Sequence, residues 1–173
     1  MVSSETKDHI FNAGSMELIN PDSPKDSNWR PDSSFVPTNR LGPIGSTDKQ
    51  CRYPTLVVKV ASSETKTHVF SKAHKYLGPN TAIQIVVVFL IRPDEKSPAD
   101  RLQVLKFVRG QQNPWVCSLA DPLCTKAGDP AFRLQLPVGL LFDSARLPPA
   151  LLGKADSDLE VDLFHWKQEY GKA

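Results

Sequence analysis

The middle of the chain has the pattern of a strand, a helix and a second strand, and this order constrains the fold more than any other feature. Residues 56–60 are an apolar, mostly β-branched run that ends at a Ser-Ser pair, and residues 64–77 then carry apolar side chains at helical spacing. Residues 83–91 form a second apolar run. Two strands joined by a helix of this length predict a crossover unit, with parallel neighbouring strands and the helix on one face of their sheet.

The helix between these strands has its own start and stop signals. Ser62 or Ser63 is expected to cap its first turn, and Gly78 followed by a proline is expected to end it. The apolar residues that recur on one face, and should pack on the sheet, are Val69, Ala73 and Tyr76.

Four later segments complete the predicted sheet. Strands are expected within residues 101–109, 114–119, 132–138 and 156–164, and a short helix within residues 164–170. The segment 156–164 alternates apolar with acidic residues, which is typical of an edge strand guarded by charge. These elements predict an α/β fold with a mixed sheet and flanking helices.

Length and composition favour one soluble domain. The chain has 173 residues, of which 40% are hydrophobic, and its formal net charge of +2 is too small to indicate a partner. Its three cysteines have no zinc-site spacing, and its longest apolar run is too short to cross a bilayer. We expect a soluble intracellular protein without a membrane partner, with an N-terminal arm of residues 1–27 and a single domain of residues 28–170.

Lys59 is the one charged residue inside the first apolar run. An unpaired ammonium group is costly to bury, so such a residue lies at an edge or is held by a partner in a site. Asp32 follows a proline just before a short strand-like stretch. By itself, a Pro-Asp-Ser sequence is typical of a turn.

Three segments, in this order, resemble the PD-(D/E)XK nuclease-like superfamily, specifically the Uma-type restriction endonucleases and their fungal relatives. Arg30-Pro-Asp-Ser-Ser-Phe35 is similar to the metal-binding aspartate segment of that group, and Pro54-Thr-Leu-Val-Val-Lys-Val-Ala-Ser-Ser-Glu64 is similar to its P-x-VVVEVA-x-SE strand. Lys72-Ala-His-Lys-Tyr-Leu77 is similar to its helical K-x-x-x-YL motif. The resemblance covers residues 28–92 well and implies a restriction-endonuclease-like fold, here expected to be shortened at the N-terminus.

The resemblance also implies a chemistry. In that group two carboxylates bind Mg²⁺, and a lysine positions or activates the attacking water, which suits a hard cation that prefers oxygen ligands. By position, Asp32 corresponds to the first carboxylate and Lys72 to the lysine. The second carboxylate is expected at position 59, where this chain has Lys59.

Replacing a carboxylate with an ammonium group changes the local charge by two units and disfavours a divalent cation. Three alternatives remain open. Glu64 could replace the missing ligand, so that Asp32 and Glu64 bind Mg²⁺; Lys59 could form a structural ion pair with Asp32; or the site could be lost without such pairing. The ion pair is the simplest alternative, because it satisfies a buried charge without invoking activity.

Three functions follow from these alternatives. The first is a restriction-endonuclease-like protein that is catalytically impaired or inactive. The second is an active Mg²⁺-dependent DNA endonuclease that uses Asp32, Glu64 and Lys72. The third is a non-enzymatic module that binds nucleic acid or protein, with Lys72 and Lys75 as the nucleic-acid contacts.

Other polar residues are weaker candidates. His68 is expected to face solvent on the helix. Lys106 and Arg109 could join Lys72 and Lys75 on a phosphate-binding surface, although scattered surface charges are the commoner arrangement.

Overall fold

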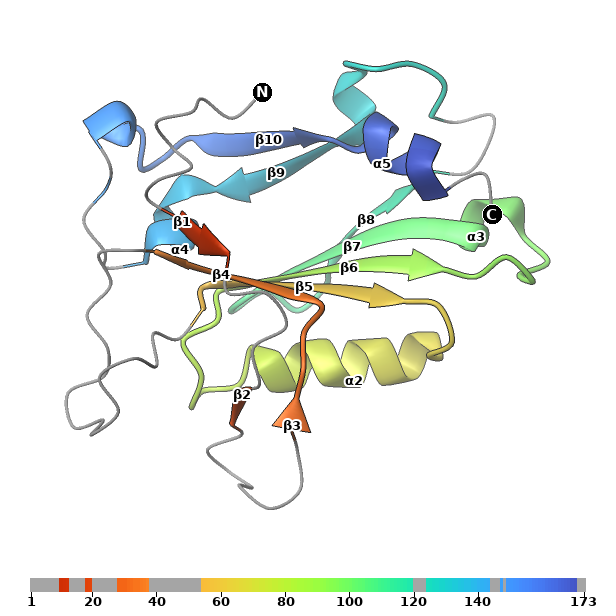
Figure 1. Ribbon diagram of the computed structural model, residues 1–173, viewed down its shortest axis with the longest axis horizontal. Helices are drawn as coiled ribbons and strands as arrows, with labels where there is room; N and C mark the ends of the chain where they lie inside the picture. Colours follow the sequence, from red (N-terminus) through yellow and green to blue (C-terminus); the bar gives the residue numbers. More distant parts are fainter. Residues whose placement is uncertain are drawn as a thin grey trace.

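A computed structural model describes residues 10–12, 18–19, 28–37, 54–119, 124–143, 147 and 149–170. Within this part of the chain, the largest sheet has six strands (Figure 1). Their spatial order is β1 (Ile10–Asn12), β4 (Ser33–Pro37), β5 (Leu56–Ala61), β6 (Ile85–Ile91), β7 (Leu102–Val108) and β8 (Trp115–Ser118).

Smaller elements surround this sheet. Two antiparallel ribbons pair β9 (Arg133–Pro137) with β10 (Asp158–Asp162), and β2 (Leu18–Ile19) with β3 (Asn28–Trp29). The helices in the described part of the chain are α2 (Lys66–Tyr76), α3 (Pro98–Arg101), α4 (Val138–Phe142) and α5 (Leu163–Tyr170). Single 3₁₀ turns lie at Pro130–Phe132 and Pro149–Leu151.

The predicted crossover unit is confirmed. Strands β5 and β6 are parallel neighbours, and their register places Lys59 beside Val88. The other neighbouring strands of the large sheet pair antiparallel, so the sheet is mixed. The predicted α/β class, with a mixed sheet and flanking helices, is therefore confirmed.

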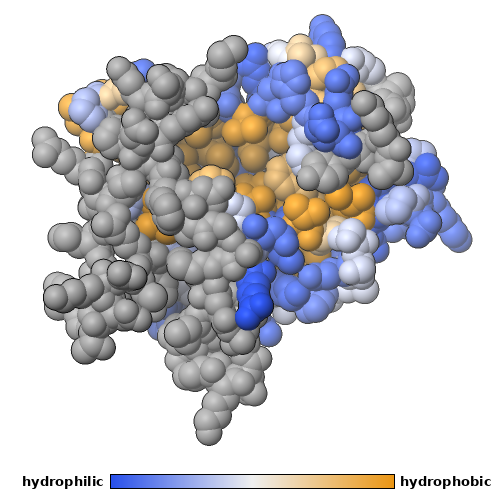
Figure 2. Space-filling model, in the orientation of Figure 1, coloured by the Kyte–Doolittle hydropathy of each residue, from blue (hydrophilic) through white to orange (hydrophobic). Residues whose placement is uncertain are grey.

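The large sheet separates two apolar cores. Helix α2 packs on one face, where Val69, Ala73 and Tyr76 meet residues of β5, β6 and β7. The β9–β10 ribbon, α4 and α5 lie over the other face (Figure 1). Figure 2, in the same orientation, shows apolar side chains gathered between that ribbon and the strands of the large sheet. Helix α2 thus covers the face of β5 on which Lys59 lies.

Strand β6 is central, as its sequence predicts. Its residues Ile85, Val86, Val87 and Val88 are each no more than 2% exposed, because the two cores cover opposite faces of the strand. A strand covered on both sides buries apolar side chains on both faces, and this explains its unbroken apolar sequence.

The remaining predictions have mixed outcomes. Strands β7, β8, β9 and β10 lie within the segments expected for them, and helix α5 begins one residue before its predicted segment. The two last strands form a ribbon of their own, and α3 and α4 were not predicted. Most of the predicted arm of residues 1–27 lies outside the described residues. None of the helices in the described part is long and apolar enough to cross a membrane.

Arg109 stabilises the turn that follows α2 and does not face a ligand. Its guanidinium group donates hydrogen bonds to the carbonyl oxygens of Gly78, Thr81 and Ile83, at 2.7 to 3.0 Å. Arg109 therefore uses its guanidinium group within the fold rather than on a phosphate-binding surface, which agrees with the expected scatter of charges.

Replacement of Arg109 with alanine should lower the free energy of unfolding by about 2 to 3 kcal/mol, since several partly buried carbonyl groups lose a charged donor. Urea unfolding followed by circular dichroism measures this. Arg101→Ala is the control, because the exposed Arg101 donates to one carbonyl group, that of Glu95. Equal losses in the two variants would contradict this role of Arg109.

Candidate functional site

Asp32 lies at the bend that enters β4 and is held against the neighbouring strand β5. Its backbone N–H donates to the carbonyl oxygen of Val58, at 3.1 Å. Its carboxylate oxygen Oδ2 accepts a hydrogen bond from the backbone N–H of Val60, at 2.6 Å. These two bonds flank residue 59, so the carboxylate lies beside the Lys59 side chain.

Lys59 points to the face of the sheet that α2 covers. Its neighbours at alternate positions, Val57 and Ala61, belong to the core under that helix, and strand alternation places Lys59 with them. Its Nζ lies 3.1 Å from Oδ2 of Asp32, and the two side chains are 19% and 45% exposed. The ion pair predicted as the simplest alternative is confirmed.

Glu64 precedes α2 and pairs with residues of that helix. Its Oε1 accepts a hydrogen bond from Nζ of Lys72 at 2.9 Å, and Nδ1 of His68 lies 3.7 Å from its Oε2. Its side chain is 18% exposed, and Oε2 has no hydrogen-bond partner among the described residues. The side chain of His68 is 57% exposed, which confirms the expectation that it faces solvent.

The hydroxyl group of Tyr76 is affected by both Asp32 and Glu64. Its side chain lies under α2 and the residue is only 4% exposed. Burial, followed by the negative charges of Asp32 and Glu64, raises the pKa of the Tyr76 hydroxyl to about 12. The negative charges of both carboxylates therefore act in the same direction on this hydroxyl group. The helical spacing predicted only a packing role for Tyr76, although its position four residues after Lys72 places both on one stripe of the helix.

Asp32, Lys59, Glu64 and Lys72, here called the four-charge site, consist of two ion pairs. The cation of each pair lies within 3.1 Å of a carboxylate oxygen. The site has no net charge when all four groups are ionised, so it presents no excess of negative charge to a metal ion.

The residues present do not fit a Mg²⁺ ion. A cation bound by Asp32 would meet the Lys59 ammonium group at the same oxygen, and one bound by Glu64 would compete with Lys72. Within the described residues, no three or more His, Cys, Asp or Glu side chains are grouped so as to hold a metal. The predicted replacement of the missing ligand by Glu64 would require Glu64 to leave Lys72.

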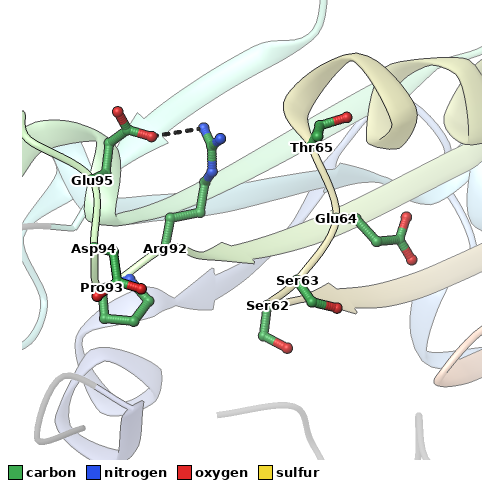
Figure 3. Close-up of a pocket in the computed structure, with 8 residues that line it drawn as sticks. All are labelled: Ser62, Ser63, Glu64, Thr65, Arg92, Pro93, Asp94 and Glu95. Carbon is green, nitrogen blue, oxygen red and sulfur yellow. Dashed lines mark ion pairs between the residues drawn. The ribbon is translucent and has the colours of Figure 1, made fainter.

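A shallow pocket lies beside the site, at the carboxyl ends of β5 and β6 (Figure 3). Its cavity volume is about 240 Å³. Residues 62–65 line one side and residues 92–95 the other, where Arg92 and Glu95 form an ion pair at 3.1 Å. In Figure 3 the Glu64 carboxylate points away from Arg92. The pocket and the four-charge site thus share Glu64 but have separate cations.

The cap of α2 differs from the prediction. Thr65, rather than Ser62 or Ser63, caps the helix, and its hydroxyl oxygen accepts a hydrogen bond from the N–H of His68. The helix begins at Lys66, so both serines lie too far before its first turn to act as its N-cap.

The basic residues considered for a phosphate-binding surface are scattered, which is the commoner arrangement named above. Lys75 is exposed on α2. Lys106 lies on the opposite face of the sheet, where its Nζ donates to the Gln135 carbonyl oxygen at 2.8 Å and lies over the Trp115 ring. Burial lowers the pKa of the Lys106 ammonium group, and the charge of Asp158 partly opposes this effect.

Comparisons of the chain with models of protein families, with curated proteins and with solved structures find no match. The relationship to PD-(D/E)XK nucleases therefore stays a hypothesis that rests on the sequence segments quoted above.

The ion pair between Asp32 and Lys59 should have a coupling free energy of about 1 kcal/mol in a double-mutant cycle with Asp32→Ala and Lys59→Met. Asp32→Ala should be the more destabilising variant, because Lys59 loses its counter-charge and the N–H of Val60 loses its hydrogen-bond acceptor. Urea unfolding of the four proteins measures these values. The more exposed pair of Arg133 and Glu160 is the control, for which we expect a smaller coupling. Absence of coupling between Asp32 and Lys59 would contradict the arrangement.

The raised pKa of Tyr76 predicts a loss of stability in alkali. The folded protein holds the phenolic proton more tightly than the unfolded chain, so this contribution is complete below about pH 10 and is lost as the pH rises towards 12. Absorbance titration of tyrosinate should show one late-titrating group that is missing in Tyr76→Phe. Stability that falls equally in Tyr76→Phe and the wild type over this range would argue against the effect.

Proposed function

We propose that the chain is a restriction-endonuclease-like protein in which Lys59 replaces a metal ligand, so that Mg²⁺-dependent hydrolysis of phosphodiesters is impaired or lost. The observation that supports this most is the ion pair at 3.1 Å between Lys59 and Asp32. Asp32 is the residue that the resemblance would assign to the metal, and its carboxylate instead forms an ion pair with the Lys59 ammonium group.

The energetic argument concerns both partners of that pair. Binding of Mg²⁺ to Asp32 would bring two positive charges next to the ammonium group of Lys59, whose side chain is only 19% exposed. Either the repulsion remains, or Lys59 leaves and its partly buried charge loses its partner. Both outcomes raise the free energy of the metal-bound state.

An active enzyme is the alternative that needs more rearrangement. Asp32 and Glu64 would have to bind one Mg²⁺ together, while Lys72 would have to act on the attacking water. In the structure Lys72 and Glu64 form an ion pair with each other, at 2.9 Å. This second alternative therefore requires both ion pairs of the four-charge site to open.

A nucleic-acid-binding function without catalysis is the second candidate, and the composition of α2 favours it. The helix contains three lysines and no acidic residue, and Lys66 and Lys75 are exposed. Lys72 is partly engaged by Glu64. Exposed lysines of this kind would attract a phosphate backbone through screened charge interactions and without a metal ion.

Incubation with supercoiled plasmid and Mg²⁺ tests the principal proposal. We expect no cleavage by the wild type, and we expect Lys59→Glu to bind Mg²⁺ at least about tenfold more tightly, because a repulsive group becomes a ligand. Calorimetric titration measures the metal affinity. Lys75→Glu is the matched control, since it makes the same change of charge at an exposed position of α2 and should leave the affinity unchanged.

Cleavage by the wild type that disappears in Asp32→Ala would overturn the proposal and favour the active enzyme. If Lys59→Glu gains neither metal binding nor cleavage, the nuclease ancestry itself loses its support.

The second candidate predicts salt-dependent binding of DNA in the presence of EDTA. The double variant Lys66→Glu, Lys75→Glu should weaken binding and reduce its dependence on salt concentration, because it removes counterion release at two positions. Fluorescence anisotropy with a labelled duplex measures both. A double variant of the exposed Lys96 and Lys154, which lie outside α2, is the control with the same total charge. Equal weakening in both double variants would indicate a nonspecific effect of net charge.

A further inference from the structure

We draw no further inference here: the strongest candidate, the partly exposed apolar surface that Val58, Phe89 and Trp166 form on the face of the large sheet opposite α2, carries no proposal because nothing in the described part of the structure shows what covers it.

Discussion

The charge of Lys59 on the α2 side of the large sheet has to be neutralised, and Asp32 is the residue that does so. Oδ2 of Asp32 accepts a hydrogen bond from the Val60 backbone N–H and forms an ion pair with the Lys59 ammonium group, so one carboxylate oxygen joins β5 to the start of β4. This interaction allows a lysine to occupy a position flanked by the buried Val57 and Ala61. The same interaction neutralises the carboxylate to which the proposed function assigns a metal ion.

The parts of the fold that could be predicted are those in which local pattern and tertiary packing agree. The apolar runs that became β5 and β6, with α2 between them, are long enough for periodicity to distinguish strand from helix, and the rule for crossover connections then determines that the strands are parallel. The β9–β10 ribbon was harder to predict, because an alternating segment does not show which strand it will pair with. The short helix α4 is five residues long, too short for helical periodicity to be recognised.

The candidate site was predictable where a single charged residue stood within an apolar segment. Lys59 stood out in an apolar strand, and the resemblance to the nuclease segments singled out Asp32, whose pairing with Lys59 was one of three alternatives. Lys72 and Glu64 were each singled out, but their mutual ion pair depends on how the Glu64 side chain lies along the helix, which sequence spacing does not specify. The effect of Asp32 and Glu64 on the Tyr76 hydroxyl was not predicted, because the helical spacing indicates only where the apolar ring packs. The structural role of Arg109 could not be predicted, since its carbonyl partners belong to a turn whose shape only the folded chain defines.

The proposed loss of metal binding depends on the ion pair between the Lys59 ammonium group and the Asp32 carboxylate. Diffraction from crystals soaked in Mn²⁺, a surrogate for Mg²⁺, tests this most directly. The anomalous signal locates the metal, and the electron density locates the Lys59 side chain in the same crystal. We predict that the wild type shows Nζ of Lys59 within hydrogen-bonding distance of Oδ2 of Asp32, with no anomalous peak at that carboxylate. A manganese peak bound by Asp32 and Glu64 in the wild type, with Lys59 and Lys72 displaced, would contradict the account.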